Sequence, residues 1–568
     1  MKRFGILVAF LTASAFGQSR DAQFNQLADR FLDEAVLRFD PVTGTSWGFH
    51  QYDSQLSSDS HAEIQAQIAA LHKFEGEVQS FDPKGLSAYV AADRELVLGQ
   101  IRGSLLSLEK VRGWEKNPDR YSGGVTNAIF VIMSRNFAPA VERLKSVIAR
   151  ERLVLRVFQS ARENLKNPPQ VFTEVALEQI PGIVSFFQND VPKAFQSVKD
   201  AALVAEFKKT NQGVIDELSA YQAWMKKDLL PRSRGDFRIG AETYRKKLEY
   251  DEMVDTPLDK LLAMGYQDLH KNQEWFKGVA AEIDPKKTPQ QILDELERDH
   301  PPAGQLLTRF QSVLGGLREY IEQRHIVTIP SPVLPILEET PPFMRALTTA
   351  SMDTPGPYEE VAKEAFFNVT LPEPGWPAKE VEEYLEGFNR GTIISTAVHE
   401  VYPGHYSQFL WLKRVPTKVR KLLGCSSNAE GWAHYSEQMM LDEGYGNGDL
   451  RLRLGQLQDA LLRDARFIAG IEMHMGKMTR EQALEFFVKE GYQVRPVAEK
   501  ESKRGTSDPT YLVYTLGKME IMKLREDYTV QKGAKYSLQE FHDAFMGQGT
   551  APIKIVRRAL LGNDSPVL

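Results

Sequence analysis

The chain has 568 residues, of which 42% are hydrophobic and 26% are charged, and a formal net charge of −6. This is enough apolar material for one large core or for two to three lobes, and there is no excess of basic residues that would indicate nucleic acid or an anionic membrane as a partner. The single cysteine, Cys425, excludes an internal disulfide, so stability must come from packing and from any bound metal.

The N-terminus has the layout of a secretory signal peptide. Two basic residues at positions 2 and 3 precede an apolar run over 4–13, and the small-residue site Ala15-Phe16-Gly17 follows. The run is far shorter than the roughly 20 residues of a membrane-spanning helix, and no cysteine follows the cleavage site to accept a lipid. We predict a signal peptide over 1–17 and a mature protein exported to the periplasm or the medium. An uncleaved N-terminal helix is the alternative.

The next 300 residues are predicted to be helical. From Asp21 to about His325, apolar residues recur at three- and four-residue spacing, as in 24–39 and 139–158. Proline and glycine at Asp40-Pro41, 167–169 and Pro181-Gly182 predict breaks between helices. We therefore expect a helical N-terminal lobe over 18–325.

A short region with a different residue composition follows the predicted helical lobe. Between about 326 and 376, β-branched residues and prolines predict short strands. Helical periodicity resumes at Lys379, and capping sequences predict helix starts at Thr479 and Ser537. The fold class predicted is mainly α, with a small β-sheet and a second lobe over 326–568.

Histidines and glutamates cluster in this second lobe. Although the chain has 11 histidines, three of them, His399, His405 and His434, fall within 36 consecutive positions. Glu400 and Glu430 lie among them, and Glu437 follows three positions after the last. A zinc ion that hydrolyses amides needs about three histidine or carboxylate ligands, an open position for water and a carboxylate that accepts the water proton. We predict one zinc ion on His399, His405 and Glu430, with Glu400 as the general base.

The spacing of the two histidines in HEVYPGH requires a distorted helix. In an ideal helix, His405 would lie roughly 120° around the axis from His399. Pro403 lacks the N–H that would bond the carbonyl of His399, and Gly404 accepts backbone angles that other residues do not. We predict a break at Pro403-Gly404 that brings both rings to one ion. Taken singly, a His-Glu pair on a solvated helix face and a Pro-Gly turn are the ordinary interpretations.

The segment NAEGWAHYSEQMM supplies the second half of the predicted site. On a helix, Glu430, His434 and Glu437 share one face because they are four and then three residues apart. We expect His434 or Glu437 to orient a metal ligand through a hydrogen bond on the side of that ligand away from the metal.

The chain resembles the bacterial domain-of-unknown-function family 885, which is similar to helical zinc peptidases such as carboxypeptidase Taq and the oligoendopeptidases. The resemblance rests on blocks spread along the chain, namely FLDEAVLRFDPVTGTSWGFHQYD, HEVYPGHYSQ, EGWAHYSE, LLRDARFIAGIEMH, TREQALEFF, PTYLVYTLGK and FHDAFMGQGTAPIKIV. It implies a zincin-like helical fold with a deep channel, zinc held by His399, His405 and Glu430, and Glu400 as general base. It also implies a strand along the cleft that pairs with the substrate backbone, for which 365–370 is the candidate; an ordinary buried strand is the alternative.

Further roles follow from the mechanism that the metal implies. The oxyanion of the tetrahedral intermediate needs a hydrogen-bond donor, for which Tyr514 is the first candidate and His474 the second; a tyrosine among apolar neighbours is otherwise a core residue. If the enzyme trims peptide ends, a cation must bind the substrate carboxylate. Arg504 is favoured for this role over Arg463, Arg466 and Arg495, although surface exposure is the ordinary interpretation of each.

Three functions are compatible with these predictions. The first is a zinc peptidase acting on short peptides, the second is a zinc amidase acting on non-peptide or modified amino-acid amides, and the third is a non-catalytic exported binding protein. The presence of all four residues His399, Glu400, His405 and Glu430 favours the two enzymes. The sequence does not indicate an oligomeric state or the preferred side chains of a substrate.

Overall fold

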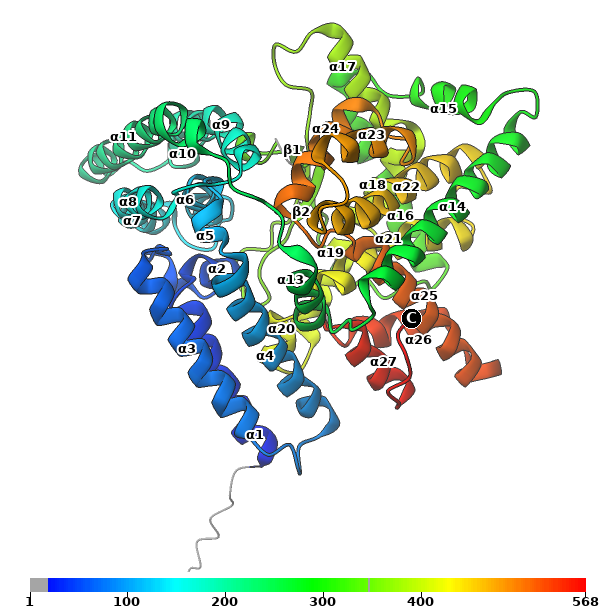
Figure 1. Ribbon diagram of the computed structural model, residues 1–568, viewed down its shortest axis with the longest axis horizontal. Coiled ribbons are helices and arrows are strands. Elements are labelled where there is room, and N and C mark those ends of the chain that lie inside the picture. The colour runs from blue at the N-terminus through cyan, green and yellow to red at the C-terminus, as the bar shows by residue number, and fades with distance from the viewer. Residues whose placement is uncertain (1–18, 346–347) are drawn as a thin grey trace, which may run out of the picture.

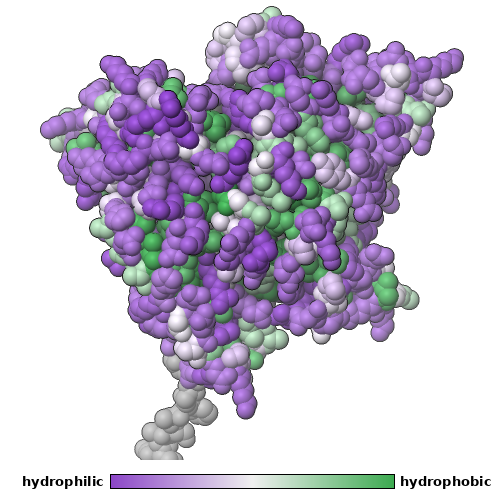
Figure 2. All heavy atoms as spheres, in the orientation of Figure 1, coloured by the Kyte–Doolittle hydropathy of each residue, from purple (hydrophilic) through white to green (hydrophobic). Residues whose placement is uncertain are grey.

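The computed structural model describes residues 19–345 and 348–568; the predicted signal peptide lies outside these ranges. The described chain is mainly helical, with a small three-stranded sheet. In Figure 1 the early helices α1 to α11 lie on the left of the molecule, and α14, α22 and α25 lie on the right. Figure 2 shows that polar residues cover most of this face, while hydrophobic residues reach the surface near its middle.

The helices before the sheet have the following bounds: α1 (Arg20–Phe31), α2 (Pro41–Trp47), α3 (His61–Ser80), α4 (Ala88–Leu106), α5 (Gly113–Lys116), α6 (Asp119–Met133), α7 (Ala140–Glu151), α8 (Val154–Asn164), α9 (Gln170–Ser185), α10 (Val191–Ala194), α11 (Ala201–Trp224), α12 (Leu230–Arg232), α13 (Gly240–Lys247), α14 (Leu258–Ile283), α15 (Pro289–Glu297) and α16 (Leu306–Gln323).

The helices after the sheet have the following bounds: α17 (Ala378–Leu385), α18 (Arg390–Glu400), α19 (His405–Trp411), α20 (Lys418–Leu422), α21 (Ser426–Asp442), α22 (Leu450–His474), α23 (Arg480–Lys489), α24 (Arg495–Ser507), α25 (Val513–Lys532), α26 (Leu538–Met546) and α27 (Ile553–Leu561). None of the helices in the described ranges is both long and apolar enough to cross a membrane.

Side chains from both ends of the chain share the largest core. Phe24 and Phe31 of α1 pack in the same cluster as Trp432 of α21 and Phe541 of α26. A second core lies mainly among the helices α6 to α11 and also includes Phe343 and Ala362. The helices on the two sides of residue 325 are therefore joined by continuous apolar packing, which stabilises the fold in proportion to the area removed from water.

The expected helix signals are largely confirmed. The breaks predicted at Asp40-Pro41 and 167–169 are present, and the Thr479 side chain begins α23 through a capping box with Gln482. The predicted helix over 139–158 is instead two helices, α7 and α8, separated by a turn at 152–153. No glycine or proline marks this turn, so the sequence pattern could not locate it.

The break predicted at Pro181-Gly182 is wrong, because α9 continues through Pro181. A proline inside a helix costs about 3 kcal/mol. Ile180 and Ile183 on either side are fully buried in the second core. Burying each is worth about 1.5–3 kcal/mol, so packing offsets the lost backbone hydrogen bond.

The sheet confirms the strands expected between 326 and 376. It consists of β1 (Ile336–Glu339), β2 (Ala350–Asp353) and β3 (Phe366–Val369), in the order β1-β3-β2. β3 pairs with β1 in parallel and with β2 antiparallel. The strand proposed to pair with substrate, 365–370, is thus the central strand, and both of its edges are already hydrogen-bonded. That expectation was wrong, and β2 is the edge strand on this side.

Candidate metal centre

The two histidines of HEVYPGH lie on two separate helices. Helix α18 ends at Glu400, a turn over 401–404 follows, and α19 begins at His405. The Tyr402-Pro403 peptide bond in this turn is cis. A Cβ on Gly404 would lie 1.8 Å from the carbonyl oxygen of His399, so only glycine fits there. The predicted break is confirmed, and the imidazole rings of His399 and His405 lie 4.8 Å apart between their centroids.

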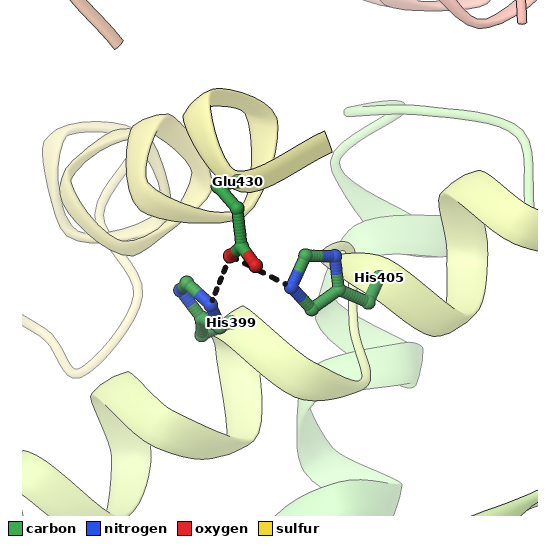
Figure 3. A group of neighbouring side chains, drawn as sticks. All are labelled: His399, His405 and Glu430. Atoms are coloured by element: carbon green, nitrogen blue, oxygen red, sulfur yellow. Dashed lines mark hydrogen bonds and ion pairs between the residues drawn. The ribbon is translucent and has the colours of Figure 1, made fainter. Parts of the chain in front are cut away.

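Glu430 reaches the two rings from α21. Its Oε2 atom lies 3.3 Å from Nε2 of His399 and 3.2 Å from Nε2 of His405. Figure 3 shows the carboxylate between the two imidazoles. Helix α21 is held against α25 by a close backbone approach, because a Cβ on Gly431 would meet the backbone of Gly517 at 2.5 Å. The residue next to Glu430 is therefore fixed by helix packing.

The three side chains have the donor types and the spacing to hold a metal ion such as zinc. Among the described residues they form a group whose three ligand atoms lie within 4.8 Å of one another. Two ligand atoms bound at about 2.05 Å to a tetrahedral zinc are about 3.3 Å apart, which matches the two nitrogen-to-oxygen separations of Glu430. Two imidazoles and one carboxylate are also the donor set of catalytic zinc sites, which leave a fourth position open.

Glu437 lies behind the metal-facing groups. Its Oε1 atom accepts a hydrogen bond of 2.7 Å from Nδ1 of His399 and lies 3.0 Å from Nη2 of Arg463. Its Oε2 atom accepts from Nδ1 of His434 at 3.1 Å. Glu437 and His434 are fully buried. Since Nδ1 of His399 donates to Glu437, its Nε2 presents a lone pair to a metal, which is the arrangement expected of a carboxylate behind a ligating histidine.

The pKa values of His399 and Glu430 indicate that these two side chains share a proton at the position where a metal would bind. Burial lowers the pKa of His399, but hydrogen bonds to Glu430 and Glu437 outweigh it and raise the pKa to about 9. Burial would raise the pKa of Glu430, but His405 and His399 hold it well below its ordinary value. Burial and the charge of Lys518 lower the pKa of His434 to about 3, so this ring is neutral. A metal cation would replace the proton that His399 and Glu430 share.

Glu400 and Tyr514 line a pocket of about 100 Å³ beside His399. The Glu400 side chain is mostly buried and has no hydrogen bond or ion pair with any residue in the described ranges, so its carboxylate is free to accept a proton. The Tyr514 ring stacks on that of His399 with centroids 6.1 Å apart. Burial raises the pKa of Tyr514 to about 12, although Arg504 opposes the shift. The Tyr514 hydroxyl accepts from Arg504 at 3.0 Å, which leaves its own proton available.

Three of the four arginines considered for carboxylate binding line this pocket: Arg463, Arg466 and Arg504. Arg495 lies elsewhere on α24, where it is exposed and pairs with Glu485 and Glu499. The pocket also contains Asp459, Lys500 and Glu501, which the sequence reasoning missed. Asp459 precedes Arg463 by one helical turn, and that spacing was a usable signal. Nothing in the charged sequence of α24 distinguishes Lys500 from its neighbours.

His474 is not brought to the site. It ends α22, about 16 Å along the helix from Arg463, because each residue advances the helix by about 1.5 Å. Its Nε2 bonds the carbonyl oxygen of Gly505 at 2.8 Å, and its ring contacts Phe237. Of the two predicted oxyanion donors, the structure therefore places only Tyr514 beside the metal-facing groups.

Comparisons with known proteins agree with this fold. The family described as "Bacterial protein of unknown function (DUF885)" matches residues 41–560. Two solved structures, each described as a "putative lipoprotein", superpose on almost the whole chain. The protein from Shewanella oneidensis, of unknown function, is 27% identical, with a TM-score of 0.77 over 95% of this chain and 99% of its own. The protein from Colwellia psychrerythraea is 17% identical, with a TM-score of 0.74 over 96% and 99%. No curated protein matches the chain.

Proposed function

This chain belongs to the DUF885 family of bacterial proteins, and from the geometry of its candidate metal centre we propose that it is a zinc-dependent hydrolase that cleaves amide bonds in short peptides. The observation that carries the proposal is the position of the Glu430 carboxylate, 3.3 and 3.2 Å from the Nε2 atoms of His399 and His405. These are ligand separations of a tetrahedral zinc site. The likeness to helical zinc peptidases, a zincin-like fold and a channel for substrate are parts of the same proposal.

The roles of the protein groups follow from their positions. When bound, zinc supplies an activated water and polarises the carbonyl to be attacked. Glu400 lies next to His399 in sequence, lines the same pocket and is uncommitted, so it takes the proton of the attacking water and passes it to the leaving amine. Tyr514 donates a hydrogen bond from its hydroxyl group to the developing oxyanion. Glu437 holds His399 in the orientation that keeps Nε2 toward the metal.

The substrate backbone is proposed to lie along β2. Ala350 of this strand and the preceding residues Thr348 and Thr349 line the pocket together with Glu400. β2 pairs with β3 along one edge, and no strand of the described ranges pairs with the other. An extended peptide can add to such an edge through main-chain hydrogen bonds.

Export is proposed from two observations. The N-terminal sequence has the pattern of a signal peptide, and two similar structures carry the description of lipoproteins. This chain has no cysteine near the expected cleavage site, since its single cysteine is Cys425. The signal-peptide pattern and the description of the two similar structures together support an exported protein.

The metal content of the purified protein and its activity on a mixed peptide library test the function. We expect one zinc per chain and cleavage that Glu400→Gln abolishes while zinc is retained. Glu163→Gln, an exposed position on α8, is the matched control. His405→Ala should lose zinc, whereas the exposed His72→Ala should not.

The remaining outcomes separate the competing functions. Stoichiometric zinc without cleavage of any peptide would favour the second function, a zinc amidase whose substrate is a non-peptide amide. Absence of zinc affinity in the wild-type protein would overturn the hydrolase altogether and leave a binding protein.

A further inference from the structure

The pocket beside Glu400 contains more positive groups than its own carboxylates neutralise. Its lining includes four cations, Arg463, Arg466, Lys500 and Arg504. Two of them are fully paired. Arg463 contacts Glu437 at 3.0 Å and Asp459 at 3.2 Å. Arg466 forms a bidentate pair with Glu501, with both distances 2.7 Å. These carboxylates are committed to the two arginines, and Glu400 forms no ion pair within the described residues, so no carboxylate of the pocket lining neutralises Lys500 or Arg504.

Lys500 has no carboxylate partner within ion-pair distance among the described residues. Its ammonium donates to the carbonyl oxygen of Arg345 at 3.0 Å and lies 5.1 Å from the centroid of the Tyr384 ring. An ammonium has three donors, so this contact leaves most of its capacity unused. Burial lowers the pKa of Lys500 to about 8, although the charges of Glu373, Glu178 and Glu501 oppose the shift.

Arg504 is only partly neutralised. One of its nitrogens, Nη2, contacts Asp508 at 3.2 Å and the hydroxyl of Tyr514 at 3.0 Å. Asp508 is half exposed, and a pair of that kind is weakened by solvent. The other guanidinium nitrogens have no partner among the described residues, so the planar fork that binds carboxylates is open.

The two cations are close to the proposed reaction centre and to each other. Lys500 and Arg504 are four residues apart on α24, so they lie on one face of the helix. Arg504 contacts Tyr514, whose ring stacks on His399. In a peptide the next carbonyl carbon lies within about 4 Å of the scissile one, because one extended residue spans about 3.3–3.6 Å. A carboxylate on the residue after the scissile bond therefore lies about one residue length from the reacting carbonyl, and Lys500 and Arg504 line the same pocket as Glu400 and Tyr514.

We propose that Lys500 and Arg504 form an anion subsite that binds a carboxylate on the residue released by cleavage, so that the substrates are peptides or acylated amino acids with an acidic group directly after the scissile bond. This inference rests on the proposed hydrolase and names its substrate class. The carboxylate belongs either to a free C-terminus or to an acidic side chain, and the two sources share the chemistry that the subsite recognises.

Matched substrates test the inference. Blocked dipeptides that end in alanine are prepared as the free acid and as the carboxamide, and a third series ends in aspartate carboxamide. We expect wild-type kcat/KM for the free acid to exceed that for the alanine carboxamide by at least tenfold, mainly through KM. Lys500→Met and Arg504→Gln should each reduce this ratio at least fivefold, and Arg495→Gln, an exposed cation on the same helix, should preserve it. Rapid cleavage of the aspartate carboxamide would assign the carboxylate to a side chain instead of the C-terminus.

Binding to an inactive protein separates this inference from the proposed function. The free acid and the carboxamide are titrated calorimetrically into Glu400→Gln protein, alone and combined with Lys500→Met or Arg504→Gln, after thermal unfolding has shown which variants are folded. Tighter binding of the acid that depends on either cation supports the subsite even where no peptide is cleaved. The subsite would be overturned if acid and carboxamide bound equally well, or if the preference for the acid survived in both folded variants. Glu400-dependent cleavage without any preference for the acid would refute the subsite but still support the proposed hydrolase.

Discussion

Nδ1 of His399 donates a hydrogen bond of 2.7 Å to Oε1 of Glu437, a residue that is 38 positions away and fully buried. The same carboxylate also accepts a hydrogen bond from Nδ1 of His434 and forms an ion pair with Arg463. One buried glutamate thus fixes the tautomer and orientation of a proposed zinc ligand. The network extends from α18 through α21 to α22, so the metal-facing geometry depends on three helices at once.

The first prediction concerns Glu437. Glu437→Gln keeps the shape of the side chain but removes the charge that holds the His399 ring. Such partners of metal ligands typically contribute about 10–100-fold in metal affinity. We expect zinc affinity, measured by competition with a chromophoric chelator, to fall by about that factor. Glu163→Gln serves as the control, and an unchanged affinity in Glu437→Gln would show that the network does not orient the ligand.

Gly404 gives a prediction that leaves every proposed ligand intact. In Gly404→Ala the new Cβ would lie 1.8 Å from the carbonyl oxygen of His399, so the turn between α18 and α19 must shift. We expect a loss of zinc binding and about 1–3 kcal/mol of stability, as for overpacked sites. The control is Gly213→Ala in α11, where a Cβ meets nothing within 4 Å. Chemical denaturation and zinc titration of both variants provide the measurement, and parallel behaviour would contradict the prediction.

The pKa of His399 predicts how zinc binding depends on pH. Hydrogen bonds to Glu430 and Glu437 overcome burial and raise this pKa to about 9 in the metal-free protein, from an ordinary value of 6.5. Zinc must displace this proton, so its affinity should rise with pH until about pH 9 and then level off. Isothermal titration between pH 6 and pH 10 in buffers of different ionisation enthalpy would measure the released proton. No proton release at pH 7 would refute the assignment.

The same group predicts an opposite trend in the stability of the metal-free protein. Because the folded-state pKa is above the unfolded value, protonation of His399 stabilises the fold fully below about pH 6.5, and this contribution is lost as pH rises through about 9. We expect the midpoint of thermal unfolding of the zinc-free protein to fall over this interval relative to that of His399→Gln. A difference between the two proteins that is independent of pH would contradict the prediction.

Tyr514 is predicted to act in the chemical step rather than in metal binding. Removing one oxyanion donor typically lowers kcat by about 10²–10³. Tyr514→Phe should therefore lose activity by roughly this factor while it keeps zinc and the stacking on His399. Tyr528→Phe, on the same helix α25 but in the apolar core, is the matched control. Steady-state kinetics would contradict the role if only KM changed.

Several elements could be predicted from sequence because their signals are local. Helix periodicity, the capping sequences and the β-branched residues and prolines of 326–376 are signals formed by residues within a few positions of one another. The break in HEVYPGH was predictable for the same reason, since Pro403 and Gly404 lie between the two histidines. The turn between α7 and α8 has no such marker, and the continuation of α9 through Pro181 depends on how Ile180 and Ile183 pack against other helices of the second core.

The sequence by itself determined the mainly helical class and which residues form the candidate metal group, because the types and spacing of His399, His405 and Glu430 restrict the chemistry available to them. Only the tertiary structure decided that β3 is a central strand, that His474 lies away from the site, and that Lys500 joins Arg504 in the pocket. These are contacts between segments far apart in the chain, and they depend on how the helices pack, which no local pattern encodes. The pairing of His399 with Glu437 depended on both the sequence and the tertiary structure. The residue types were visible in the sequence, but only the fold brings them into contact.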